Sequence, residues 1–353
     1  MPAVMAPGLV LDRPRRLPHP LRWLGWLALG LEEAMRRLVR CPHMIPPRLC
    51  GPRWAAVVAL LTLSVFAAHA AEAGRQPPKR IISLAPSTTE MLFSLGLGDR
   101  VVGVTRYCDY PPAAAAITKV GGYVDPSYEG IVALKPDLIV LLTSHRDTKT
   151  QLEKMRLRTL TVPHETIQDI HEAIRSIGEA CGEVKGADAL LSGLTNRTQA
   201  VCRAVKGRDR PRVLVCIGRD FDSGQLTGMY IAGRKGFYDQ IIELAGGLNA
   251  CPGREAAYPQ VSAEGVIRLD PDVIIDLISQ MNPGKGTPAQ MERQWAQLGM
   301  VAAVRKGRVH VIVGNQALRP GPRYIDFLEQ LARLLHPEAF TGHDSDAGRG
   351  TGH

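Results

Sequence analysis

The sequence lacks the short motifs that mark the common catalytic sites. It contains no G-x-S-x-G elbow, no G-x-x-x-x-G-K-[ST] phosphate loop, no G-x-G-x-x-G after an expected strand and no H-E-x-x-H zinc signature. His310 falls inside an expected strand, and no nucleophile can be named beside His145 and Asp147. We therefore expect no catalytic residues and no enzyme activity, and keep a two-lobed exported enzyme as the alternative from a different class.

The sequence also lacks cysteine pairs at the spacing that suits zinc. Five of the seven cysteines follow residue 70, and no C-x-x-C pair occurs among them. This absence argues against a structural zinc site, so we expect no metal site. Because five is an odd number, at least one of these thiols is unpaired or pairs outside the chain.

Long apolar runs are missing as well. The run at residues 54–68 (WAAVVALLTLSVFAA) has about the length of a signal-peptide core and is short of the ~20 residues that a membrane span needs. Arginines precede it, and Ala68-His69-Ala70 follows as a small-x-small cleavage site. We predict a cleaved signal peptide and a periplasmic product. An uncleaved anchor is the alternative.

The start of the chain has two readings. Met44 lies just upstream of the apolar run and would give a signal peptide of ordinary length, residues 44–70. We expect residues 1–43 to be an extension or a mis-called start.

Acidic residues are too few in the front of the chain to balance its arginines. The net charge is +9, and residues 1–70 contribute nine arginines against three acids, which leaves only +3 for the rest. So small an excess gives little support to a polyanionic partner, and we predict no nucleic acid. With 353 residues and 45% hydrophobic composition, the chain is long and apolar enough for two domain cores.

What the sequence does contain is one motif that occurs twice. EGIVALKPDLIV begins at Glu129 and EGVIRLDPDVII begins at Glu264, and a serine (Ser127 or Ser262) stands two residues before each glutamate. Each copy predicts a capped short helix, a Pro-Asp turn and a buried strand. Two copies this far apart predict two similar lobes rather than a solenoid.

The elements around the repeat predict α/β lobes. Residues 79–84 and 101–105 are expected strands on either side of a helix, and this β-α-β unit implies a parallel sheet. A long amphipathic helix from residue 184 lies between the two copies and would be about 33 Å long. The expected parts are an N-terminal lobe at 79–183, a linking helix at 184–207, a C-terminal lobe at 211–338 and a disordered tail at 341–353.

Tyrosines recur at matched places. Tyr123 and Tyr258 each precede the glutamate of their repeat copy by six residues, and two more tyrosines lie in the proline-bounded loop Tyr107-Cys108-Asp109-Tyr110. Any one of them could simply pack locally. Facing aromatic side chains also suit a large flat ligand, which gains buried area and stacking, so we predict a ligand cleft between the lobes.

The two glutamates have a local and a functional explanation. A glutamate in the first turn of a helix interacts favourably with the helix dipole and need do nothing more. Equivalent glutamates on two lobes are better explained by a symmetric partner with two arginine pockets, joined by charge-assisted hydrogen bonds. We predict Glu129 and Glu264 to be docking residues.

These stretches resemble a known family. From residue 79 to 337 the chain is similar to the helical-backbone (class III) periplasmic binding proteins of ABC importers, in SLAPSTTEMLFSLGLGDRVVGVT, YCDYPP, YEGIVALKPDLIV, EGVIRLDPDVII and GPRYIDFLEQLARLLHPE. The resemblance implies two Rossmann-like α/β lobes with central parallel sheets, joined by a single long backbone helix. It also implies that the lobes hinge little, that Glu129 and Glu264 salt-bridge the dimeric permease, and that the protein is a monomer.

Within that family the chain looks most like the vitamin B12 binders. The resemblance implies a corrinoid as transported ligand and no cofactor of the protein's own. Tyrosine stands at two pocket positions where a B12 binder has tryptophan, and a tyrosine hydroxyl can also ligate iron, so haem or a ferric siderophore stays open. The ligand-binding residues expected are Tyr107, Cys108, Asp109, Tyr110, Tyr123, His145, Arg219, Tyr258, Asn315 and Arg319.

Overall fold

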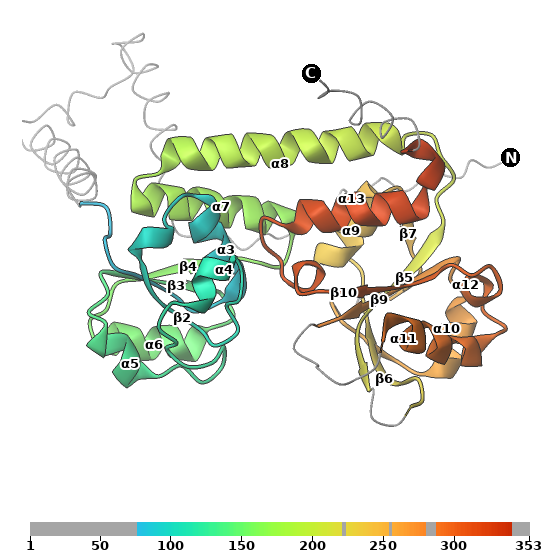
Figure 1. Ribbon diagram of the computed structural model, residues 1–353, viewed down its shortest axis with the longest axis horizontal. Coiled ribbons are helices and arrows are strands. Elements are labelled where there is room, and N and C mark those ends of the chain that lie inside the picture. The colour runs from blue at the N-terminus through green and yellow to red at the C-terminus, as the bar shows by residue number, and fades with distance from the viewer. Residues whose placement is uncertain (1–75, 221–223, 254–255, 280–286, 341–353) are drawn as a thin grey trace, which may run out of the picture. The chain divides into compact units, whose positions relative to one another are not determined.

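The computed structural model describes residues 76–220, 224–253, 256–279 and 287–340 (Figure 1). The described residues from Pro77 onward belong to one compact unit, Pro77–His353. The predicted signal peptide and the predicted disordered tail lie outside the described residues. No helix within the described ranges combines the length and the apolar character that a membrane crossing requires.

The first lobe is built on a four-stranded parallel sheet in the order β2-β1-β3-β4. Its strands are β1 (Ile81–Ser83), β2 (Val101–Val104), β3 (Leu138–Leu142) and β4 (Thr159–Val162). The order reverses beside β1, because the chain goes to β2 on one side and to β3 on the other. Open parallel sheets bind ligands at the carboxyl ends of the strands near such a reversal.

Helices cover both faces of this sheet, so the alternate residues of a strand enter different cores. Val140 and Leu142 of β3 join the cluster under α3 and α7, while Ile139 and Leu141 join the one that includes Ile131 of α5 and Leu152 of α6. The helices are α3 (Pro86–Ser94), α4 (Pro112–Ala115), α5 (Tyr128–Ala133), α6 (Arg146–Lys154) and α7 (Ile167–Cys181), with the 3-10 turn η3 (Gly98–Arg100).

The second lobe has a mixed six-stranded sheet in the order β10-β9-β5-β6-β8, with β7 paired to β5. Strands β5, β7, β9 and β10 run parallel to one another, as predicted, whereas β6 runs antiparallel to both of its neighbours, β5 and β8. The reason is the short connection after β5, since a parallel crossover needs a dozen residues or more. The strands are β5 (Arg212–Asp220), β6 (Thr227–Ile231), β7 (Leu248–Asn249), β8 (Gln260–Val261), β9 (Val273–Ile278) and β10 (Val309–Val313).

The helices of the second lobe include two that the sequence analysis did not predict, α11 and α12. They are α9 (Phe237–Leu244), α10 (Ala263–Leu269), α11 (Pro288–Trp295), α12 (Ala302–Arg305) and α13 (Tyr324–Leu335), with the 3-10 turns η4 (Ala296–Leu298), η5 (Gln316–Leu318) and η6 (Pro337–Ala339).

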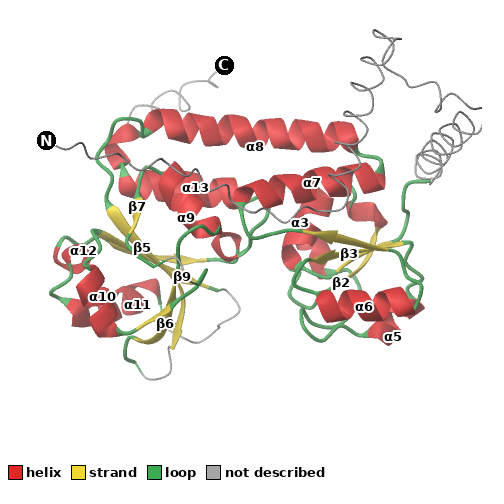
Figure 2. Ribbon diagram, turned by 180° about the vertical axis from the view of Figure 1, so that it is seen from behind, coloured by secondary structure: helices red, strands yellow, loops and turns green. Residues whose placement is uncertain are grey.

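The single long helix α8 (Val184–Ala204) connects the lobes, as predicted. Its 21 residues make it about 32 Å long. It packs on α7 of the first lobe and on α9 and α13 of the second, and Figures 1 and 2 show it lying along α7 and α13. Arg197 fastens it to α13, donating to Asp326 and Glu329 at 2.8 Å.

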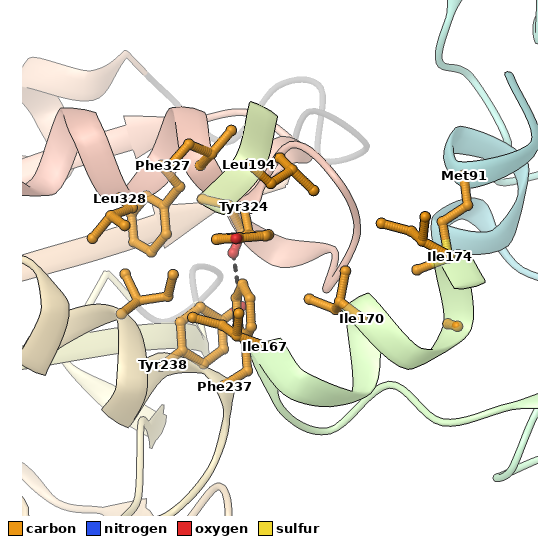
Figure 3. Packing of buried hydrophobic residues seen from close by; sticks show 14 of the residues in the cluster. Met91, Ile167, Ile170, Ile174, Leu194, Phe237, Tyr238, Tyr324, Phe327 and Leu328 are labelled. Atoms are coloured by element: carbon orange, nitrogen blue, oxygen red, sulfur yellow. Dashed lines mark hydrogen bonds between the residues drawn. The ribbon is translucent and has the colours of Figure 1, made fainter. Parts of the chain in front are cut away.

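One apolar core runs through both lobes. The same cluster contains Met91 and Ile174 of the first lobe, Leu194 of α8, and Tyr324 and Phe327 of the second lobe (Figure 3). Separating the lobes along this core would expose apolar surface to water, which is unfavourable in proportion to its area. The shared core therefore opposes a wide hinge motion.

Candidate functional site

The candidate site lies where loops after the strands of the two lobes meet. Asp109 follows β2 in the first lobe, and Asn315 follows β10 in the second. The Nδ2 of Asn315 donates to the Oδ2 of Asp109 at 2.8 Å, and the hydroxyl of Ser279, just after β9, donates to the Oδ1 of Asn315 at 2.9 Å. The carboxyl edges of both sheets thus contribute to one place, as open α/β sheets favour.

Four charged side chains join the lobes here, and we call them the interlobe network: Glu90, Asp109, Arg319 and Arg323. Arg323 donates Nε and Nη2 to the two carboxylate oxygens of Glu90 at 2.9 and 2.6 Å. Arg319 donates to Asp109 through Nη1 and through Nη2, the latter at 3.1 Å. Arg319 also lies 3.6 Å from Glu90, so the two pairs form one continuous group.

The carboxylate of Asp109 is held in its charged form. Its burial acts to raise the pKa, but the hydrogen bond and charge of Arg319, followed by the hydrogen bond from Asn315, bring the pKa below its ordinary value. Asp109 is therefore ionised at neutral pH, and the network carries two negative and two positive charges.

Two of the predicted tyrosines lie on this network. The backbone carbonyl of Tyr107 accepts from Nη2 of Arg319 at 2.9 Å. The guanidinium of Arg323 lies 3.7 Å from the ring centroid of Tyr110, a cation–π contact. The loop after β2 is thus fixed to the opposite lobe by its backbone, its acid and its aromatic ring.

Tyr123 and His145 form an aromatic edge on the first lobe. Their ring centroids are 4.3 Å apart with the rings steeply inclined, and the Tyr123 hydroxyl bonds the hydroxyl of Ser144 at 2.8 Å. Burial and the neighbouring His164 lower the pKa of His145, so its imidazole is neutral at pH 7. Nδ1 accepts from the backbone N–H of Leu142 at 3.3 Å, which places the ring proton on Nε2.

Nε2 of His145 is buried and has no hydrogen-bond partner among the described residues. Beside this edge, the loops after β3 and β4 enclose a hollow of about 370 Å³, to which Ser144 and Glu165 contribute. A buried N–H without a partner is costly, so a ligand acceptor within reach of it would gain affinity.

Tyr258 is the aromatic candidate on the second lobe. Its ring centroid is 6.2 Å from that of Tyr238, and 43% of the residue is exposed. Burial raises the pKa of Tyr258, and so does the negative charge of Glu165, which belongs to the first lobe. Tyr258 therefore lies within electrostatic range of Glu165 on the loop that follows β4.

The side chains of two residues that were predicted to bind the ligand are buried apart from the interlobe network. Cys108 is buried, and its thiol contacts the hydroxyls of Thr89 and Thr105 at 3.2 and 3.1 Å. The Arg219 side chain is wholly buried in the second lobe, where its Nε donates to Asp276 at 2.9 Å.

The sequence analysis missed Glu90 and Arg323. Glu90 lies in α3, where every residue from Ser87 to Leu92 is buried. A glutamate within so buried a segment requires a cation. That requirement was the available signal, although the identity of the cation was not readable from the sequence.

Glu129 and Glu264 occupy matching positions on the two lobes. The hydroxyl of Ser127 accepts from the N–H of Gly130, and that of Ser262 from the N–H of Gly265, both at 3.2 Å. Each glutamate lies exposed in the first turn of its helix, α5 or α10. The capped helices predicted from the repeat are confirmed. The docking role stays a prediction.

The described residues hold no group of three or more His, Cys, Asp or Glu side chains placed to bind a metal ion. All five cysteines after residue 70 fall within the described ranges and are free thiols there: Cys108, Cys181, Cys202, Cys216 and Cys251.

Comparison with known proteins adds a family and several relatives. The profile of the family described as "Periplasmic binding protein" matches residues 81–314. The chain is 28% identical over 274 residues to the ABC transporter substrate-binding lipoprotein YvrC of Bacillus subtilis, covering 75% of this chain and 82% of that protein.

Solved structures of the same kind are similar in fold. The vitamin B12 binding protein BtuF of Vibrio cholerae matches with a TM-score of 0.62 and 26% identity, covering 75% of this chain and 99% of that one. The heme-binding protein RhuT of Roseiflexus sp. RS-1 matches with a TM-score of 0.64 and 25% identity, covering 74% of this chain and 99% of that one.

Proposed function

This chain belongs to the periplasmic binding protein family, and we propose that it is the substrate-binding component of an ABC importer whose ligand is cobalamin or a related corrinoid. The family consists of transport binding proteins, so the protein captures and releases its ligand and catalyses no reaction. The macrocycle is cargo rather than a cofactor. Similarity to a substrate-binding lipoprotein and to a B12 binding protein supports this assignment.

The observation that carries the proposal is that each lobe contributes aromatic side chains, while polar groups of both lobes meet between them. The Tyr123–His145 edge belongs to the first lobe, and Tyr258 belongs to the second, where 43% of the residue is exposed. Asp109, Asn315 and Arg319 lie between the lobes and supply polar groups. A large, mostly flat macrocycle with polar side chains matches aromatic walls with a few convergent polar groups.

Haem or a ferric siderophore is the second candidate. The tyrosine hydroxyls of Tyr123 and Tyr258 are oxygen donors of the kind that ferric iron accepts, and a similar solved protein is a heme-binding protein. This candidate shares the class, the cleft and the docking mode with the first. It differs only in the ligand.

We propose that the mature protein acts in the periplasm as a monomer after removal of residues 44–70. It docks on a dimeric permease through Glu129 and Glu264, one on each lobe. Both carboxylates are exposed at the start of capped helices, so arginines of a partner could reach them without rearrangement.

The ligand is tested by calorimetric titration of the purified protein, beginning at residue 71, with cyanocobalamin, haemin and a ferric siderophore. We expect cyanocobalamin to bind most tightly. Tyr258→Ala should weaken it about tenfold, in line with the loss of one aromatic contact. Tyr230→Ala, at a residue of similar exposure on β6, is the matched control. Absence of corrinoid binding at micromolar concentrations would rule out the ligand and leave the family assignment intact.

A further inference from the structure

Asp109 reaches across to cations and donors of the other lobe. It is carried on the loop after β2, yet its partners Asn315 and Arg319 both belong to the second lobe, 206 and 210 residues away. The two carboxylate oxygens of Asp109 thereby accept the hydrogen bonds that Asn315 and Arg319 would otherwise donate to an anionic ligand. The positive charge of Arg319 is already paired with the carboxylate of Asp109.

The interlobe network has a buried half and an accessible half. The Glu90 side chain is 1% exposed and its partner Arg323 20% exposed, whereas the Asp109 side chain is 45% exposed. Glu90 also lies 3.6 Å from Arg319, and the Tyr107 carbonyl accepts from Arg319. Arg319 is therefore positioned by Glu90 and the Tyr107 carbonyl on its buried side. Asp109 is the most exposed member of the network.

This arrangement treats acidic and amide groups of a ligand differently. A carboxylate approaching Arg319 meets the like charge of Asp109 and must displace it, which leaves Asp109 partly buried without its cation. A primary amide can donate to Asp109 and needs no such exchange, because it is neutral and carries both a donor and an acceptor. Corrinoid side chains end largely in amides, whereas haem carries two carboxylates.

We propose that Asp109 is a specificity-determining residue, an internal anion that reserves Arg319 and selects amide-bearing ligands over carboxylate-bearing ones in this cleft. The proposal rests on the proposed function, since it assumes that the transported ligand lies against the interlobe network. The depressed pKa of Asp109 is consistent with it, because the carboxylate stays charged throughout the neutral range.

The test compares ligands that differ only in amide against acid. One pair is cyanocobalamin and its monocarboxylic acid, in which one side-chain amide is hydrolysed. The other is the bis-amide of haemin and haemin itself. The ratio of amide to acid affinity within each pair is measured calorimetrically for the wild type, for Asp109→Asn, and for Asp326→Asn as the control.

Asp326 is a matched control because it also pairs with an arginine and its side chain is 49% exposed, but its partner is Arg197 on α8. We expect the wild type to prefer the amide, and Asp109→Asn to move the ratio toward the acid by about tenfold or more, the worth of one charge-assisted hydrogen bond. Asp326→Asn should leave the ratio unchanged. Adding Arg319→Gln to Asp109→Asn should remove the gain for the acid.

The outcomes separate the two proposals. If Asp109→Asn and Asp326→Asn give the wild-type ratio, Asp109 does not select the ligand, while corrinoid binding stands. If the haemin pair binds and the cobalamin pair does not, the corrinoid assignment fails, and the haemin ratio still decides the role of Asp109. If neither pair binds, both proposals are overturned. Thermal unfolding of each variant establishes that it is folded.

Discussion

At the scale of single residues, the decisive feature is a buried acid in the first turns of α3. Glu90 carries a bidentate contact to Arg323, which lies 233 residues further along the chain. Removing one partner of a buried ion pair leaves the other charge without compensation, and this costs more than the pair itself contributes. Glu90 thus matters to the joining of the lobes as well as to its own helix.

Glu90→Ala should lower the free energy of unfolding by about 3 kcal/mol, because Arg323 and the nearby Arg319 lose a buried counter-ion. Urea denaturation measures the change. Glu183→Ala is the control, since the Arg100–Glu183 pair is 34% and 36% exposed and should contribute at most about 1 kcal/mol. Equal losses in the two variants would contradict the distinction.

Burial also sets the pH dependence of stability. It lowers the folded-state pKa of His145 and of His164, so the unfolded chain takes up protons first as the pH falls below about 6.5. The free energy of unfolding should therefore be highest above that pH and decrease toward pH 5. His145→Gln should flatten the decrease between pH 7 and 5. Urea denaturation at pH 7 and at pH 5 measures the change. If His145→Gln and the wild type lost the same free energy of unfolding between the two pH values, His145 would not be a cause of the decrease.

At the scale of elements, α7 and α8 form a helical hairpin, and α8 begins at residue 184, as predicted. Helix α7 carries a full capping box at Thr166 and ends at Gly182, a left-handed position with φ of 77°. Its apolar face recurs every three to four residues, the period of a helix that is buried on one side. Gly178 allows the two helices to approach closely.

Gly178→Ala should destabilise the protein by about 1–3 kcal/mol, because the added methyl would lie 2.6 Å from the Cβ of Ala187 on α8. Gly193→Ala, in the interior of α8 with no atom within 4 Å of the new methyl, should stabilise it by about 0.5–1 kcal/mol. Thermal or urea unfolding of the two variants should thus give changes of opposite sign.

Elements with weak patterns escaped the sequence analysis. Helix α11 buries only Met291 and Trp295 among its eight residues, which is too sparse a stripe to recognise as a helical face. Helix α12 has only four residues. The antiparallel β6 lies in a glycine-rich stretch that carries little strand signal.

At the scale of the whole molecule, the two lobes share one core, and each lobe carries one exposed glutamate in the first turn of a capped helix. A rigid pair of lobes keeps the two carboxylates at a constant separation, which a symmetric partner requires. The combined variant Glu129→Ala/Glu264→Ala should abolish ligand uptake in a transport assay and leave the ligand affinity of the purified protein unchanged, because neither side chain takes part in the interlobe network.

Single variants at Glu129 or Glu264 should retain partial transport, since the other lobe still engages. A fall in ligand affinity of the double variant would show instead that these glutamates line the cleft. Asp326→Asn again serves as a charge control, because it removes one exposed acid from α13.

The sequence by itself determined the two lobes, the long connecting helix and the capped helices that carry Glu129 and Glu264. Each of these follows from residues close together in the chain: a repeated motif, an apolar period, or a serine three residues before the N–H that it caps. Local chemistry fixes local backbone, so such features can be read without knowing how the elements pack.

Only the tertiary structure decided which cleft candidates meet. It joined Asp109 to Arg319 and Glu90 to Arg323 across more than two hundred residues, and it placed Arg219 in the interior beside Asp276. These partners depend on how α8 and the shared core set one lobe against the other. Because an ion pair requires atoms within about 4 Å, no spacing along the chain could have selected them.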